Sequence, residues 1–324
     1  MLNYLLRRLV MIAISLVVIM VMTFYMLHLA PGSFLDLAQI QAGQRVTGTT
    51  QLGQTRDETA AEWEERYGTD TAPWVQALIF LRHAVVLDLG TSFRFPTTTI
   101  ESLIARSFLP TFVVVFASMA LALLIGVPLG IVAALRQGSV VDRGAMFVSM
   151  IGEAIPSYVL AVVLILFLAV RWPIFPTAGY GRPEQLVLPA VALALGPIAG
   201  FARYMRSALI HSLQEDYVRT AHAKGLNLRR VVLRHAIPNS LIPLITVSGP
   251  QFAFLMVGSV WIEVMFNIPG LGRLFATAVP TRDYPLVAAS TLFFALLIMI
   301  MNLLVDIAYG VLDPRIRAGF AARR

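Results

Sequence analysis

The chain has 324 residues, of which 58% are hydrophobic and only 13% are charged, and its mean hydropathy is +0.77. A soluble domain carries about 25% charged residues, so this composition excludes a water-covered surface and predicts a membrane protein. The 25 basic residues include one lysine, Lys224, and no glycine-rich loop precedes it at P-loop spacing, which excludes a P-loop ATPase on this chain. The absence of cysteine excludes disulfides, thiolate zinc sites and cysteine nucleophiles.

Long apolar runs define the predicted membrane spans. About 20 residues at a rise of 1.5 Å cross a hydrocarbon core of about 30 Å. Six runs are close to this length, and the third and the fifth each contain one glutamate. The runs are 9–27, 107–135, 144–170, 186–202, 241–266 and 286–305. An even number of spans places both termini on one side of the membrane.

The distribution of basic residues orients these spans, because short cytoplasmic loops are enriched in Lys and Arg. With the N-terminus inside, the inner segments hold fifteen basic residues, whereas the two short outer loops hold four. Both termini are therefore predicted to be cytoplasmic. The first run is too long for the apolar region of a signal peptide and lacks a cleavage pattern, so we predict an uncleaved helix.

The predicted organisation has four parts, an N-terminal transmembrane helix, an external loop, a five-helix core and a cytoplasmic tail. They are residues 1–27, 28–106, 107–311 and 312–324. Within the external loop, 39–57 is typical of coil, whereas 58–67 and 74–86 have helical composition. Two interpretations of this loop stay open, a lid over the bundle and a docking surface for an external partner.

A cytoplasmic segment between the fourth and fifth runs, residues 217–239, predicts two short helices around 218–224 and 228–236. Gly225 is free to take the positive φ that ends the first of them. Pro238 suits the start of the next helix. Ala221 and Ala223 carry small side chains, so we expect a partner's surface to approach closely. Three arginines supply positive charge around that contact, namely Arg229, Arg230 and Arg234.

The same segment resembles the signature of the membrane-spanning subunits of binding-protein-dependent ABC importers. That signature reads Glu-Ala-Ala, three residues, Gly, nine residues, Ile, one residue, Leu-Pro. The matching positions here keep the spacing and are Arg219, Thr220, Ala221, Gly225, His235, Ile237 and Pro238. Arg, Thr and His replace the usual Glu, Ala and Ile, as in the B-type permeases of the dipeptide and oligopeptide branch.

Further short motifs carry the resemblance over nearly the whole chain. In order they are Leu29-Ala30-Pro31-Gly32, Asp88-Leu89-Gly90, Ile125-Gly126-Val127-Pro128-Leu129-Gly130, Ile155-Pro156-Ser157, Phe266-Asn267-Ile268-Pro269-Gly270-Leu271-Gly272-Arg273, Arg282-Asp283-Tyr284-Pro285 and Leu312-Asp313-Pro314-Arg315. Each is weak by itself, but their number and order make the resemblance specific.

The resemblance implies an all-α polytopic membrane protein with the type I ABC importer permease fold, located in the bacterial cytoplasmic (inner) membrane. It implies a second homologous permease subunit, two ATPase subunits that hold ATP and Mg, and an external solute-binding protein that delivers peptide. The chain is surrounded by the lipid bilayer, and no nucleic acid is expected as a partner.

The resemblance also implies mechanical coupling, in which this chain changes conformation without breaking a bond and is not an enzyme. In the family a short helix in the cytoplasmic segment rests in a cleft of the ATPase and moves when the nucleotide-bound dimer closes. The expected coupling residues are Arg219, Thr220, Ala221, Ala223, Lys224, Gly225, His235, Ile237 and Pro238.

The fifth run is predicted to line the translocation path, because interrupted helices are tolerated where freed backbone groups line a cavity. Its interruptions are Pro243, Gly249, Pro250 and Gly258. Ser248, Gln251 and Ser259 offer hydrogen bonds either to peptide backbones or to neighbouring helices, and both interpretations stay open.

Two carboxylates within the spans need an explanation, since a membrane-buried acid is costly. For Glu153, near mid-depth, we favour a structural role over contact with a peptide's amino terminus. Glu263 lies nearer the outer end, where we expect it to pair with Arg273, Arg282 or the partner chain.

The segment after the fifth run has the chemistry of a tight turn, in which Pro269 presets φ and Gly270 or Gly272 allows a positive one. Two interpretations stay open. This turn is either a plain loop or an outer gate that contacts the binding protein.

Two other classes of protein fit the sequence less well, and one variant of the permease role stays open. An ion-gradient carrier would use Glu153, Glu263 and Asp306 as a proton relay, but it would need inverted repeats that are not visible and leaves the signature unexplained. An intramembrane hydrolase lacks HExxH and GxSxG motifs, and every histidine lies outside the spans or at an end. The same permease role for nickel complexes, glutathione or another small solute stays open, as does peptide length.

Overall fold

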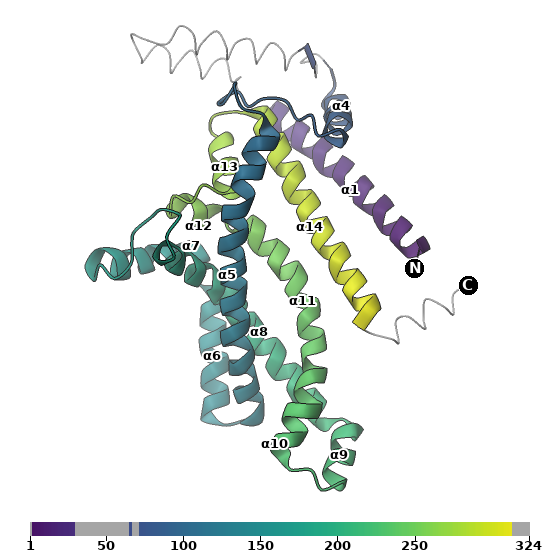
Figure 1. The fold of residues 1–324 in the computed structure, drawn as a ribbon, viewed down its shortest axis with the longest axis vertical. Coiled ribbons are helices and arrows are strands. Elements are labelled where there is room, and N and C mark those ends of the chain that lie inside the picture. The colour runs from purple at the N-terminus through teal and green to yellow at the C-terminus, as the bar shows by residue number, and fades with distance from the viewer. Residues whose placement is uncertain (1, 30–64, 67–70, 313–324) are drawn as a thin grey trace. The chain divides into compact units, whose positions relative to one another are not determined.

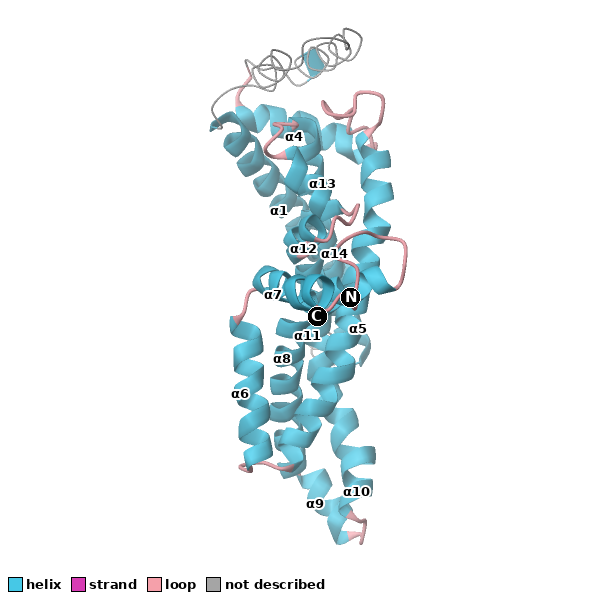
Figure 2. Cartoon of the chain, turned by 90° about the vertical axis from the view of Figure 1, so that its left-hand side faces the viewer, coloured by secondary structure: helices cyan, strands magenta, loops and turns pink. Residues whose placement is uncertain are grey.

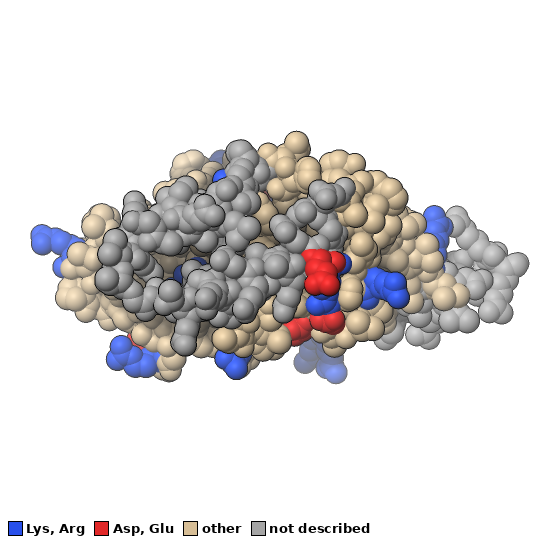
Figure 3. All heavy atoms as spheres, turned by 90° about the horizontal axis from the view of Figure 1, so that it is seen from above, with Lys and Arg blue, Asp and Glu red and all other residues tan. Residues whose placement is uncertain are grey.

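The computed structural model describes residues 2–29, 65–66 and 71–312, and these residues form helices joined by short loops (Figures 1 and 2). Within those ranges the β-pairing is one isolated bridge between Thr91 and Thr99. The chain divides into two compact units, Met1–Thr111 with Pro269–Ile300 and Phe112–Ile268 with Met301–Arg324. In the end-on view of Figure 3, most of the described atoms belong to uncharged residues, and Lys and Arg side chains project at several points of the rim.

Five helices are long and apolar enough to cross a membrane, and they match five of the predicted runs. They are α1 (Leu2–Leu29), α5 (Ile100–Leu135), α8 (Glu184–Gln214), α11 (Ile237–Gly258, joined to the short helices before it) and α14 (Tyr284–Leu312). A short helix α12 (Val260–Met265) forms the rest of the fifth run.

The third predicted run, 144–170, is not a straight span. It consists of α6 (Val140–Ala154), α7 (Ser157–Leu164) and a π-helix η1 (Ile165–Arg171), and the chain bends by 96° between α6 and α7. Pro156 causes the break, because a residue that precedes proline is driven out of the α region, and Ile155 is accordingly extended with ψ 118°. The expectation of one continuous helix is therefore corrected at Pro156.

The external segment is described in part. Helix α4 (Pro73–Val85) confirms the predicted helix at 74–86. The predictions for 39–57 and most of 58–67, and those for the tail after residue 312, lie outside the described residues. So does the side chain of Asp306.

The first unit joins α1, α4, the start of α5, a short helix α13 (Leu271–Ala278) and most of α14. Phe24 of α1 meets Phe80 of α4 with ring centroids 5.8 Å apart, and Phe275 meets Phe294 at 6.2 Å. The hydroxyl of Thr111 accepts a 2.8 Å hydrogen bond from the backbone N–H of Leu271, which fixes α13 on α5.

Asp283, immediately before α14, is the main polar anchor of this unit. Its buried carboxylate accepts hydrogen bonds from the hydroxyl of Ser92 and from the backbone N–H groups of Phe93 (3.2 Å), Arg94 (3.1 Å) and Leu286 (3.3 Å). Burial raises the pKa of Asp283, while these four donors oppose that rise. The carboxylate thus ties segment 92–94 to the start of α14.

Replacing Asp283 by Asn should free this segment, because an amide nitrogen cannot accept the hydrogen bonds that one carboxylate oxygen now receives. We expect faster tryptic cleavage after the exposed Arg94, measured by mass spectrometry on the purified protein. The control is Asp88→Asn, which removes a surface pair with Arg66 and should leave that cleavage rate unchanged. Equal rates in Asp283→Asn and the unmodified protein would contradict the anchoring role.

The second unit is organised around α8, which contacts α6, α7 and α11. Helix α5 crosses α8 at two glycines one turn apart. A Cβ atom at Gly126 would lie 2.7 Å from the carbonyl oxygen of Ile198, and one at Gly130 would overlap that of Ala202. Close backbone approach through small residues four apart is a common way for membrane helices to pack.

Gly130→Ala should therefore lower stability by about 1–3 kcal/mol, the usual cost of overpacking a close contact. The matched control is Gly144→Ala in α6, where the added methyl group meets no atom within 4 Å. There the helix propensity of alanine should preserve or raise stability by up to about 1 kcal/mol. Thermal unfolding midpoints in one detergent, at one scan rate, measure both. Equal shifts would contradict the close crossing.

Candidate coupling loop and transport cavity

Two short helices form the loop between α8 and α11, as the sequence predicts. Helix α9 (Asp216–Ala223) ends at Gly225, whose φ of +78° confirms the expected left-handed residue. Helix α10 (Leu228–Val231) begins at Asn227, whose side chain accepts a 3.0 Å hydrogen bond from the N–H of Arg230, and continues as a π-helix η2 (Val232–Ala236). Pro238 lies in the first turn of α11, again as expected.

A small apolar core holds the pair together. Val218, Ala221 and Val231 are buried, and Leu226 packs against them. The prediction that Ala221 leaves room for a partner is therefore wrong, because its methyl group faces the neighbouring helix of its own loop. Ala223, the other small residue, is exposed.

Hydroxyl groups fix this loop to the spans on either side. Ser212 of α8 donates a 3.0 Å hydrogen bond to the carbonyl oxygen of Ala236, and Ser240 of α11 donates to the same oxygen at 2.7 Å. Tyr217 meets Ser212, with their oxygens 2.5 Å apart. The loop is consequently joined to both α8 and α11, and a force on it reaches both helices.

The outer face of the loop is polar and basic. The side chains of Arg219, Thr220 and Lys224 are exposed, as are those of Arg229, Arg230 and Arg234. His235 and Ile237 are half-buried at the junction with α11. The residues that match the family signature therefore divide between an exposed face, the small core that holds Ala221, and the junction with α11.

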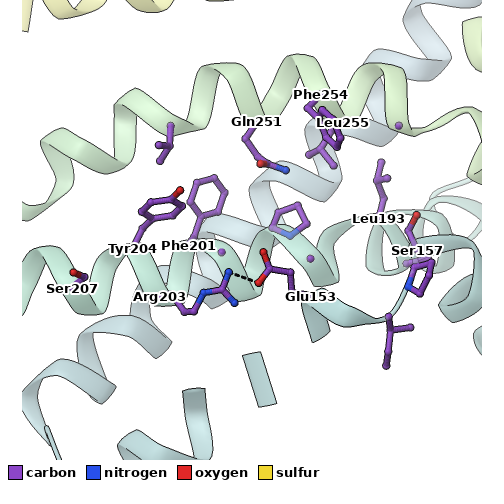
Figure 4. Close-up of a pocket in the computed structure, with 18 residues that line it drawn as sticks. Glu153, Ser157, Leu193, Phe201, Arg203, Tyr204, Ser207, Gln251, Phe254 and Leu255 are labelled. Carbon is purple, nitrogen blue, oxygen red and sulfur yellow. Dashed lines mark ion pairs between the residues drawn. The ribbon is translucent and has the colours of Figure 1, made fainter. Parts of the chain in front are cut away.

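A cavity of about 740 Å³ lies between the bend of α6 and α7, the middle of α8, and α11 (Figure 4). It brings together Glu153 and Gln251, two of the residues that the sequence predicts for the path, and α11 contributes part of its wall. Ser248 instead bonds the carbonyl oxygen of Ile245, at 2.6 Å. Ser259 and Glu263 are buried outside this lining, where the Ser259 hydroxyl donates to the Glu263 carboxylate at 2.8 Å.

Sequence reasoning missed the contribution of α8. Gly196, Pro197 and Gly200 leave the helix surface without large side chains, and this opens the floor of the cavity. Arg203 and Tyr204, further along α8, also line it. The cluster of Gly and Pro within the fourth run was a usable signal, but the run was predicted to end at residue 202, before these two side chains.

Two ion pairs connect α6 with α8, and they differ in exposure. Arg206 donates to both carboxylate oxygens of Asp142, at 2.5 and 2.7 Å, and the backbone N–H of Gly138 adds a third bond at 2.9 Å. The Asp142 side chain is 3% exposed, whereas the Glu153 side chain, paired with Arg203 in the cavity, is 54% exposed. The first pair is a closed structural joint, and the second is open to the cavity.

The predicted outer turn takes a different backbone form. Gly270 is extended, with φ −100° and ψ 177°, and Gly272 is buried within α13. The positive φ expected of a glycine is found instead at Asn267, with φ 55°. Asparagine tolerates this region better than other residues with a Cβ, so the positive φ falls three residues before Gly270.

The arrangement of spans and short helices defines the class of protein. It is similar to a chain of the MetNI methionine ABC transporter in its inward-facing conformation, with a TM-score of 0.52 at 18% identity over 66% of this chain and 97% of that one. A second crystal form of that transporter gives a TM-score of 0.54. The fold is that of the membrane-spanning part of an ABC importer.

The family follows from the sequence comparison. Residues 126–318 match the binding-protein-dependent transport system inner membrane component, and the chain belongs to this family of multi-pass transport subunits. The chain is 35% identical over 315 residues to the dipeptide transport system permease protein DppB of Bacillus subtilis (97% of this chain, 98% of that protein). It is 36% identical to the oligopeptide permease AppB of the same organism (97% and 98%) and 37% identical to the glutathione permease GsiC of Pectobacterium atrosepticum (98% and 99%).

The difference between the two ion pairs gives a measurable prediction. Asp142→Asn should lower stability by about 1–3 kcal/mol, because it leaves donors of Arg206 without their acceptor in a closed site. Glu153→Gln should change stability by less than about 1 kcal/mol, as is usual for exposed pairs. Thermal unfolding of the purified variants in one detergent compares them. Equal losses would show that the cavity pair is also a structural joint.

Proposed function

We propose that this chain is the transmembrane subunit of an ATP-driven importer of peptides, and that its loop α9–η2 couples ATP hydrolysis to the spans. The helix pair carries this proposal. Its basic face is exposed, its own core is closed, and hydroxyl bonds join it to α8 and α11. These are the properties required of a rigid element that receives a push from a partner and passes it to two helices.

The sequence contains no P-loop and the family belongs to binding-protein-dependent systems, so we expect the ATPase and the binding protein on other chains. Two ATPase subunits would hold ATP and Mg beneath the loop, a second homologous permease would complete the path, and an external solute-binding protein would deliver the cargo. The arginines and Lys224 would meet acidic or polar groups of the ATPase cleft. In this scheme the chain catalyses no reaction.

Relatives support peptides as the cargo, since two of those compared are named dipeptide and oligopeptide permeases. Glutathione, itself a small peptide, is the second candidate, because a relative of similar identity is named for its transport. An ion-gradient carrier is not supported, because the family belongs to binding-protein-dependent systems.

Reconstitution tests the function directly. Vesicles that contain this chain with its second permease and both ATPases, supplied with the binding protein and ATP, should accumulate labelled peptide. Vesicles that contain this chain alone should accumulate none. Uptake by the chain alone, driven by an ion gradient, would overturn the proposal.

Gly225→Val tests the coupling role, because a β-branched residue at φ +78° is strained and adds bulk at the end of α9. We expect peptide uptake and transport-linked ATP hydrolysis to fall at least about tenfold, with the complex still assembled. A tenfold fall in rate corresponds to a rise of about 1.4 kcal/mol in the activation free energy of the coupled step.

Gly181→Val is the control, since Gly181 also has a positive φ, +123°, and an added Cβ there meets no atom within 4 Å. It carries backbone strain outside the coupling loop and should retain uptake. Unaltered uptake in Gly225→Val would contradict the coupling role, and so would an equal loss of uptake in both variants.

A further inference from the structure

The side chains of Glu153 and Arg203 pair although their backbones lie at different levels along α8. A Cβ atom at Gly152 would lie 3.3 Å from Leu195 Cγ, so Glu153 is close to the level of residue 195 on α8. Arg203 lies eight residues further along α8, which corresponds to about 12 Å at a rise of 1.5 Å per residue. The two side chains therefore extend towards each other along the cavity before they pair.

The floor of the cavity allows this reach. Gly196 and Gly200 line the interval between the two levels, and neither presents a side chain that would separate Arg203 from Glu153. Figure 4 shows the guanidinium group of Arg203 extended toward Glu153, with Gln251 pointing towards the pair from α11. The charges thus lie within the cavity and not within a packed helix interface.

This pair is not needed to hold α6 against α8. The closed pair of Asp142 and Arg206 already joins those helices, and the packing of Gly152 on Leu195 adds to it. The Glu153 and Arg203 side chains are 54% and 35% exposed, so a solute in the cavity can reach both. Exposed ion pairs contribute only about 0–1 kcal/mol to stability, so this pair can exchange its partners for the opposite charges of a ligand at little cost.

We propose that Glu153 and Arg203 form a binding site for the two charged ends of a short, unblocked peptide, and that they neutralise each other when the cavity is empty. The α-ammonium group donates hydrogen bonds to the Glu153 carboxylate, and Arg203 donates a forked pair of hydrogen bonds to the α-carboxylate. This inference rests on the proposed function, since it specifies which peptides the same path accepts.

The geometry also sets a length. Once separated, the two residues sit at levels about 12 Å apart on the helices. The charged groups meet between these two levels, so the gap that opens between them when the side chains withdraw is at most about this interval. An extended chain covers about 3.3–3.6 Å per residue, so peptides of up to about four residues fit. Gln251 faces the ion pair from α11 and offers both a donor and an acceptor to the peptide backbone.

The test uses the complete importer in vesicles and three tripeptides of one sequence, with free ends, with an acetylated amino terminus and with an amidated carboxyl terminus. Each uptake rate is divided by that of the unmodified complex for the same peptide, which removes any preference of the binding protein. Glu153→Gln should lose about tenfold with free-ended and amidated peptides and little with the acetylated one. Arg203→Gln should lose about tenfold with free-ended and acetylated peptides and little with the amidated one.

Two control variants remove like charges elsewhere, Glu184→Gln at the start of α8 and Arg171→Gln at the end of η1. Both residues are exposed and outside the cavity lining, and neither variant should change the ratios between peptides. Equal losses for all three peptides in Glu153→Gln and Arg203→Gln would overturn the binding site in favour of a conformational role, and so would unchanged uptake. If the unmodified complex takes up none of the peptides, the proposed function fails together with the site.

Discussion

Both the packing and the cavity of the second unit depend on glycines, in α8 itself and in the face of α5 that meets it. On one side of α8, the carbonyl groups of Ile198 and Ala202 meet α5 at Gly126 and Gly130, where even one methyl group would collide. On another side, Gly196 and Gly200 leave the floor of the cavity bare. Close packing against α5 and an open cavity therefore lie on different sides of one helix, and both depend on glycines, those of α5 for the packing and those of α8 for the cavity. In lipid, where no hydrophobic force drives helices together, such close contact is a principal source of helix association.

Sequence reasoning succeeded where the determinants are local. The long apolar runs, the two short helices of the coupling loop, the left-handed Gly225 and the position of Pro238 each follow from a few neighbouring residues. Where the expectation failed, a competing local effect had been overlooked. Pro156 breaks the third run, and Asn267 takes the positive φ assigned to a glycine.

The remaining features depend on contacts between distant segments. Asp283 binds residues about 190 positions earlier, and Arg206 reaches Asp142 across 64 positions. No periodicity in one sequence identifies such partners. The cavity pair illustrates the same limit, since Glu153 was recognised as unusual from its place in an apolar run, whereas Arg203 was counted only as a cytoplasmic charge. The expectation for Ala221 failed for a related reason, because the sequence does not show which face of α9 packs against α10.

The π-helix before α11 has a geometric consequence for the whole loop. In η2 the backbone N–H of Ile237 bonds the carbonyl oxygen of Val232, five residues earlier, so this turn holds one residue more than an α-helical turn. One residue corresponds to about 100° of rotation around a helix axis. Relative to α11, the inserted residue therefore turns the preceding segment by about 100°, while the bonds of Ser212 to Tyr217 and Ala236 fix the same segment to α8.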